Sequence, residues 1–294
     1  MNLAWLFKVL PQYLVPQHLL SELVHRLANR ETPWLKNLMI KGFVRLYDID
    51  LDEAAEPDPT AYPCFNAFFT RALKPGARPI ADAELISPAD GVVSRAGRID
   101  GHTLVQAKCH DYTLEALLGG DISYARQFEN GAQAVIYLSP RDYHRVHMPT
   151  DGRLVSMTYV PGDLFAVNPA TVAHVDHLFA RNERLILRFE TDRGPLALIM
   201  VGAIFVGSME TVWAGRITPP YGPALKHWDY EKEDLRFARG EEIGRFNMGS
   251  TVIILTPDNA LARLADLPTP ATIRMGEPLL PATESETTSE ASGG

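Results

Sequence analysis

The feature that most constrains this chain is a series of short apolar runs, spaced regularly from about residue 85 onwards. Stretches of Gly, Pro, Asp and Asn separate them, and helical patterns interrupt only briefly, as at residues 113–118. The runs cover residues 91–93, 134–138, 185–189, 196–201 and 251–255. Short strands with turn signals between them are typical of an antiparallel sandwich or barrel. We therefore predict an α+β fold, in which a mainly β, sandwich- or barrel-like body follows a helical N-terminus.

The N-terminal segment differs from the rest of the chain in charge and in periodicity. Residues 1–47 hold six Lys or Arg and two Glu, a net charge of +4, although the whole chain carries −8. After Pro16, leucines and valines recur at helical spacing, and Thr32-Pro33 is typical of a second helix start. Amphipathic helices with a basic bias are typical of an interfacial membrane anchor. Apolar helix faces also pack on protein cores, so the segment alone leaves both interpretations open.

Several classes of protein are disfavoured by composition. The acidic total, 36 Asp and Glu against 28 Lys and Arg, argues against nucleic-acid binding. Cys64 and Cys109 are too few for a disulfide scaffold or a Cys-rich zinc site. No run approaches the roughly 20 apolar residues of a membrane span, and no secretory signal is expected. We expect an anchor at 1–50, a catalytic body at 51–280 and a disordered Thr, Ser and Glu-rich tail at 281–294.

Three short stretches carry potential chemistry. Asp90 lies in Ser-Pro-Ala-Asp-Gly, which taken alone favours a plain Asp-Gly turn. His144 and His147 lie in a loop rich in Arg, Asp and Tyr that directly follows an apolar run. Zinc helices usually place two histidines four residues apart, so we expect no metal site. Ser250 follows Gly249 before the last apolar run, where a turn or bulge is the plain alternative.

Together these stretches resemble the bacterial phosphatidylserine decarboxylases, and the resemblance runs through nearly the whole chain. The family's cleavage signature is usually Leu-Gly-Ser-Thr, and here it is Met248-Gly249-Ser250-Thr251. The other matching segments are Phe-Asn-Ala-Phe-Phe-Thr-Arg at 65–71, Pro-Ala-Asp-Gly at 88–91, and residues 137–147, 159–168, 179–184, 201–203 and 212–215. This combination in one order is highly specific.

The resemblance implies a proenzyme that cleaves itself between Gly249 and Ser250. The Ser250 hydroxyl attacks the Gly249 carbonyl, His147 takes the proton, and Asp90 orients the imidazole. The resulting ester eliminates to leave dehydroalanine, which hydrolyses to a pyruvoyl group on the new N-terminus. The products are a large chain, 1–249, and a small chain, 250–294, which stay associated as a heterodimer.

The resemblance also implies the reaction. The pyruvoyl ketone forms a Schiff base with the amine of phosphatidylserine and accepts electrons as CO₂ leaves, giving phosphatidylethanolamine. His144 is then free to donate a proton to the substrate, or it only braces the loop. A lipid substrate favours the anchor interpretation of residues 1–47, on an anionic membrane surface at the cytoplasmic side of the cell membrane.

Two other functions remain open from the residues alone. One is a hydrolase that uses Asp90, His147 and Ser250 on other molecules. The other is a non-catalytic β module that binds membranes. Both predict an intact chain without a carbonyl-reactive group, whereas the decarboxylase predicts two chains.

Overall fold

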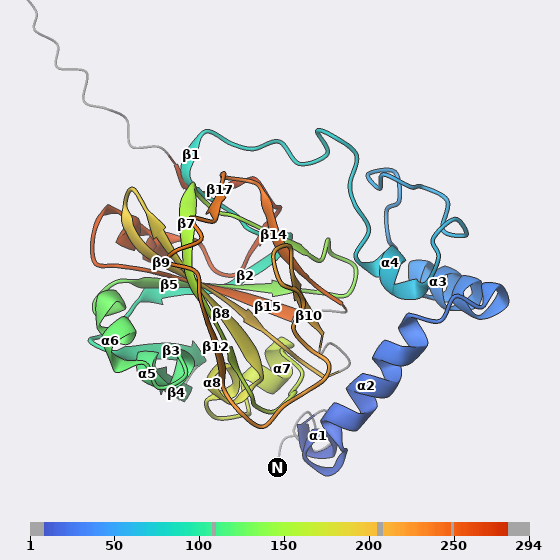
Figure 1. Ribbon diagram of the computed structural model, residues 1–294, viewed down its shortest axis with the longest axis horizontal. Helices are drawn as coiled ribbons and strands as arrows, with labels where there is room; N and C mark the ends of the chain where they lie inside the picture. The colour runs from blue at the N-terminus through green and yellow to red at the C-terminus, as the bar shows by residue number, and fades with distance from the viewer. Residues whose placement is uncertain (1–8, 108–109, 205–207, 248–249, 282–294) are drawn as a thin grey trace, which may run out of the picture.

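The computed structural model describes residues 9–107, 110–204, 208–247 and 250–281, and it shows a β body with the N-terminal helices to one side (Figure 1). The α-helices are α1 (Leu10–Leu14), α2 (Gln17–Ala28), α3 (Pro33–Tyr47), α4 (Phe65–Phe69), α5 (Leu114–Leu117), α6 (Ile122–Ala125), α7 (Pro169–Val172) and α8 (Leu178–Arg181), with 3₁₀ segments η2 (Arg126–Phe128) and η3 (Ala260–Asp266).

One large antiparallel sheet forms the centre of the body. Its strands, in spatial order, are β12 (Lys226–Asp229), β7 (Gly152–Val160), β8 (Arg184–Thr191), β9 (Gly194–Val201), β15 (Ser250–Thr256), β5 (Ala132–Leu138), β2 (Gly91–Arg98) and β16 (Ala271–Ile273), while β13 (Arg236–Phe237) also pairs with β7. Every residue of β15 is buried, because protein covers both faces of the sheet there. The predicted β body is confirmed. The barrel alternative is not seen, since the described strands form an open path from β12 to β16.

A smaller sheet packs on the large one. Its order is β11 (Gly215–Arg216), β10 (Met209–Thr211), β14 (Glu242–Phe246) and β6 (Arg145–His147). Gly244 of β14 lets β10 lie this close to β14, because a Cβ at that position would lie 2.5 Å from the Glu210 carbonyl oxygen of β10. Two further pairs join β1 (Ala83–Ile86) to β17 (Pro278–Pro281) and β3 (Thr103–Ala107) to β4 (His110–Thr113).

The N-terminal helices form where the sequence predicts them. Pro33 is the first residue of α3, although the Thr32 side chain makes no capping hydrogen bond. One face of α3 packs with α4 in a second apolar cluster that includes Ile40, Phe65 and Phe68. The Cys64 thiol is free and accepts the Ala67 N–H at the start of α4. No described helix is long and apolar enough to cross a membrane.

The same helices also present an apolar surface to solvent. Large apolar side chains are exposed at i, i+4 and i+8 on α2 and at i and i+4 on α3. These residues, here called the exposed stripe, are Leu19, Leu23, Leu27, Trp34 and Leu38. One face of α3 therefore packs in a core, as one interpretation predicts, and the exposed stripe is the surface to which the anchor prediction applies. Several features of the sequence lie outside the described residues: the apolar run before residue 9, Cys109, Met248 and Gly249 of the cleavage signature, and the tail from 282 onwards.

Candidate active site

The predicted site residues meet at one end of the large sheet. Strands β2, β5 and β15 are neighbours, and Asp90 immediately precedes β2. The loop carrying His144 begins where β5 ends, and Ser250, the first residue of β15, pairs with Leu138, the last of β5. Because the strands are antiparallel, these three ends lie together. Gly91 allows β2 to approach β5 this closely, since a Cβ there would lie 2.3 Å from the Tyr137 carbonyl oxygen.

The loop between β5 and β6 is shaped by its own side chains. Asp142 accepts hydrogen bonds from both the Ser139 N–H and the Ser139 hydroxyl at 2.7 Å, and its N–H donates to the Ser139 carbonyl at 2.9 Å. This closes a tight turn around Pro140 and Arg141. Burial raises the pKa of the Asp142 carboxyl. The turn directs the Asp142 carbonyl at the ring of His144.

His144 is fully buried and has one free ring nitrogen. Its Nδ1 lies 2.7 Å from the Asp142 carbonyl oxygen, and its ring centroid lies 4.2 Å from that of Phe69. A carbonyl only accepts hydrogen bonds, so Nδ1 carries the proton and Nε2 is a bare lone pair. Nε2 has no hydrogen-bond partner in the structure. Burial lowers the pKa of His144 to about 3, so the ring is neutral near pH 7.

His147, in contrast, has both ring nitrogens engaged. Nδ1–H donates to the Gly240 carbonyl at 2.8 Å, which leaves Nε2 to accept from the Tyr143 hydroxyl at 3.0 Å. Burial lowers its pKa as well. The His147 N–H donates to the Pro88 carbonyl at 2.8 Å, which ties this strand to the segment that carries Asp90.

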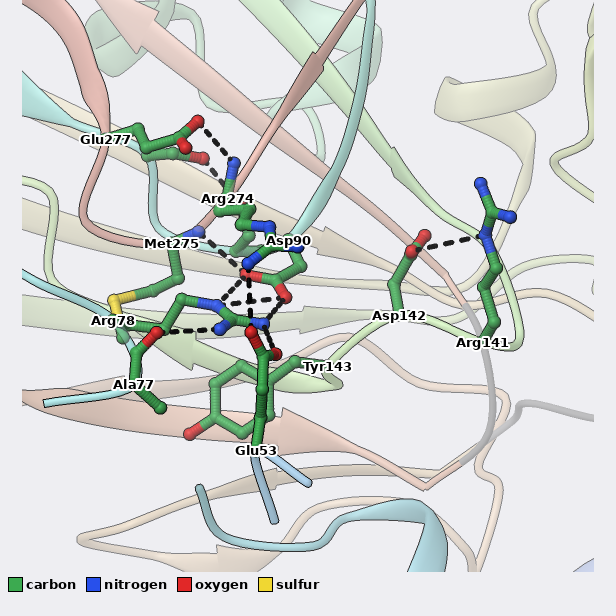
Figure 2. A network of polar contacts seen from close by, with 12 residues as sticks. Glu53, Ala77, Arg78, Asp90, Arg141, Asp142, Tyr143, Arg274, Met275 and Glu277 are labelled. Carbon is green, nitrogen blue, oxygen red and sulfur yellow. Dashed lines mark hydrogen bonds and ion pairs between the residues drawn. The ribbon is translucent and has the colours of Figure 1, made fainter. Parts of the chain in front are cut away.

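Asp90 is held by an arginine rather than by a histidine (Figure 2). Arg78 donates from Nε at 3.0 Å and from Nη2 at 2.6 Å to the two carboxylate oxygens, and the Met275 N–H donates at 2.8 Å. Arg78 also pairs with Glu53 at 2.8 Å, and Arg274 pairs with Glu53 at 2.9 Å. The expected hydrogen bond from His147 to Asp90 is therefore absent from these described residues. The ring is oriented by Gly240 and Tyr143, and Asp90 acts on it only through its charge.

Ser250 is buried, and its hydroxyl has no hydrogen-bond partner among the residues that the structure describes. Gly249 and Met248 lie outside the described residues. Before that gap, Asn247 is fixed by Asn66 of α4 at 3.0 Å and by Ser208 at 2.7 Å. An unpartnered buried hydroxyl costs about 1–3 kcal/mol, and such groups often have a chemical role.

Sequence reasoning missed the side chains that position this site. Tyr143 lies inside the loop already singled out, so its motif offered a signal. Arg78 lies in an irregular segment without a motif, and its contact with Asp90 spans 12 residues of chain. In the described part of the chain, no three His, Cys, Asp or Glu side chains gather as a metal ion would require.

Comparison with known proteins identifies the family. A family model described as phosphatidylserine decarboxylase matches residues 65–280, and one described as PSD matches residues 7–48. A phosphatidylserine decarboxylase proenzyme of Alkalilimnicola ehrlichii is 57% identical over 246 residues, covering 83% of this chain and 85% of its own length. Proteins of the same name from Methylobacillus flagellatus and a Polaromonas species are 52% and 51% identical, covering 87% and 92% of this chain and 92% and 96% of their own lengths. The chain therefore belongs to the phosphatidylserine decarboxylase family.

Proposed function

We propose that this protein is a phosphatidylserine decarboxylase that matures by cutting itself between Gly249 and Ser250. The observation that carries the proposal is the buried, unpartnered Ser250 hydroxyl, which begins a central strand beside the loop of His144 and lies inside the matched family region. Catalysis on other molecules by an Asp-His-Ser triad is less well supported, because Asp90 is bonded to Arg78 and the Ser250 hydroxyl is inaccessible to solvent.

The residues around Ser250 fit a pyruvoyl group formed from that serine. The pairing of β15 with β5 holds the backbone of Ser250 in place, and the hydroxyls of Ser250 and Thr251 are both buried without partners. Once formed, a pyruvoyl group supplies a carbonyl that engages the substrate amine and withdraws electrons as CO₂ leaves.

Maturation requires a base for the Ser250 proton, because a serine hydroxyl is a weak nucleophile. We assign this role to His147, as the resemblance implies. In the structure its Nε2 is occupied by the Tyr143 hydroxyl, so His147 must exchange that hydroxyl for the hydroxyl of Ser250. The charge of Asp90 stabilises the imidazolium that forms.

We assign His144 to the later decarboxylation step. There it must accept a proton before it can donate one. A ring that is neutral near pH 7 must first gain the proton that it gives away. The substrate nitrogen loses protons as it adds to the carbonyl, and the free Nε2 of His144 can accept one of them. The ring can then return it to the substrate carbon that loses CO₂.

The site of action follows from the substrate. We propose that the exposed stripe of α2 and α3 binds an anionic membrane surface peripherally, on the cytoplasmic side of the cell membrane. A membrane-binding module without catalysis shares this surface but leaves the chain intact.

Denaturing mass spectrometry tests the proposal. We expect wild-type protein to give two masses, for residues 1–249 and 250–294, the latter carrying a group that borohydride with substrate can trap. Ser250→Ala removes the nucleophile and should remain one inactive chain, and Ser250→Cys should cleave more slowly. Ser156→Ala is the matched control, because that hydroxyl is also buried and unpartnered. Cleavage of Ser250→Ala at the same bond would refute the mechanism.

A further inference from the structure

A cavity of about 210 Å³ lies beside Thr251, the residue next to Ser250. The sheet contributes Arg95, Tyr137 and Thr251 to its wall. Apolar side chains of the segment that includes α7 cover it, among them Val167 and Val172. Of the residues named in the cavity wall, Thr251 lies next to the proposed cleavage bond. Asp90, His144, His147 and Ser250 are not among the residues that line the cavity.

Three polar atoms at this cavity have no hydrogen-bond partner in the described part of the chain. They are the Nε of Arg95, the Oε1 of Gln106 and the Oγ1 of Thr251, all buried. Gln106 is 4% exposed, and its amide nitrogen donates to the carbonyls of Val172 and Val175 at 2.9 and 2.8 Å, which fixes Oε1 as the unused acceptor. Burying such a group is unfavourable unless a ligand forms a hydrogen bond with it.

Arg95 is the cation of this cavity. Its guanidinium makes no hydrogen bond or ion pair with the described residues. Arg98, three residues further along β2, is instead paired with Asp258 at 3.0 Å on the surface. A lone guanidinium against an apolar wall is complementary to an anion attached to hydrocarbon, because it offers donors to the anion and leaves the wall for the chain.

Phosphatidylserine has two anionic groups, a carboxylate and a phosphodiester, and a guanidinium bound to one would affect the reaction rate differently from one bound to the other. The carboxylate loses its charge as CO₂ leaves, so a guanidinium bound to it would stabilise the ground state and slow the reaction. The phosphodiester keeps its charge throughout, so binding it affects ground state and transition state equally. The substrate ammonium has only donors, and it matches the unused oxygens of Gln106 and Thr251.

We propose that this cavity is the headgroup site, in which Arg95 binds the substrate phosphodiester and Gln106 Oε1 accepts a hydrogen bond from the substrate amine. The assignment rests on the proposed decarboxylase function.

The covering segment connects this cavity to the membrane-binding helices. Gln12 of α1 accepts the Ala166 N–H at 2.8 Å and donates to the Thr171 hydroxyl at 3.1 Å. These contacts lie on either side of Val167, one of the wall residues. The acyl end of a lipid bound by Arg95 would therefore leave towards α1 and α2, where the exposed stripe begins.

The test compares Arg95→Gln with Arg98→Gln, which remove the same charge from the same strand. Phosphatidylserine is presented in mixed micelles with a nonionic detergent, and kcat and KM are measured per pyruvoyl group. We expect Arg95→Gln to mature normally and to raise KM at least tenfold with kcat within about threefold, and Arg95→Lys to recover most of the loss. Glycerophosphoethanolamine should inhibit the wild type and Arg98→Gln, and should inhibit Arg95→Gln at least tenfold less.

Two results overturn the headgroup assignment while leaving the decarboxylase intact. One is unchanged KM in Arg95→Gln, and the other is a loss confined to kcat, which would place the guanidinium on the carboxylate. Failure of the wild type to mature or to release CO₂ would instead reject the proposed function itself.

Discussion

His144 and His147, three residues apart, differ in the hydrogen bonds that their rings make. The His147 ring has a partner at each nitrogen, the Tyr143 hydroxyl from its own loop and the Gly240 carbonyl from outside the loop. The His144 ring has a free Nε2 and no exposure to solvent. A spacing of three residues could not predict this difference, because it depends on carbonyls and a hydroxyl that the fold supplies.

Replacement of each histidine should separate maturation from turnover. We expect His147→Ala to remain an uncut chain. His144→Ala should still be cut, but turnover per pyruvoyl group should fall 10²- to 10⁴-fold, the usual loss for a missing acid–base group. Exposed His227→Ala is the control. If His144 only braces the loop, its variant will mature poorly while the cut fraction keeps near-normal turnover.

Another buried titratable group, Glu183, should make stability depend on pH. Its carboxyl accepts from the Tyr159 hydroxyl at 2.9 Å, its other oxygen is unpartnered, and burial raises its pKa from 4.5 to about 7. The folded protein therefore keeps a proton that the unfolded chain releases from about pH 4.5 upwards. The free energy of unfolding should fall as pH rises from about 4.5 to 7, by at most about 3 kcal/mol.

Glu183→Gln should remove that fall, since glutamine keeps the shape and does not titrate. Urea unfolding at several pH values measures it, in a Ser250→Ala background so that a single chain unfolds. Glu190→Gln, exposed on β8, is the control. An equal pH dependence in Glu183→Gln and its parent would contradict the assignment.

At the scale of elements, apolar patterns predicted the strands well, because the central strands are buried on both faces and therefore read as continuous apolar runs. Sheet closure could not be predicted, since it depends on which edge strands meet, and β12 and β16 carry no pattern that specifies a partner. The position of Arg78 against Asp90 was equally hidden, because an irregular segment without periodicity brings it there.

The exposed stripe supports a prediction about α2. We expect Leu19→Ser, Leu23→Ser and Leu27→Ser together to reduce liposome binding more than a hundredfold, because half-exposed leucines that enter a bilayer contribute roughly 1 kcal/mol each and often more. Binding by the wild type should also weaken with salt, because residues 1–47 carry a net charge of +4.

Flotation with liposomes containing an anionic lipid measures this binding. Ile122→Ser with Leu225→Ser is the control, because both side chains are about half exposed on the β body. Undiminished flotation of the triple variant would show that another surface binds the membrane.

At the scale of the whole molecule, the predicted small chain supplies strands that the large chain cannot replace. Strand β15 pairs on one side with β5 and on the other with β9, so it forms the middle of the large sheet. Strands β16 and β17 pair with β2 and β1. Cleavage at residue 249 would therefore break one peptide bond and leave these ladders in place, so the two chains should remain associated.

Cleavage should nevertheless change how the protein unfolds. A cut molecule releases two separate chains on unfolding, so its midpoint rises with protein concentration, whereas a single chain shows no such dependence. A tenfold rise in concentration is worth about 1.4 kcal/mol, which corresponds to an increase in Tm of roughly 2 °C for a chain of this size. We expect this dependence in the wild type and none in Ser250→Ala, measured by thermal unfolding followed by circular dichroism.

Size-exclusion chromatography should show both chains of the wild type in one peak, and separation only in concentrated guanidinium chloride. Loss of the small chain under native conditions would mean that β15 is not held by its two neighbours as the sheet order requires.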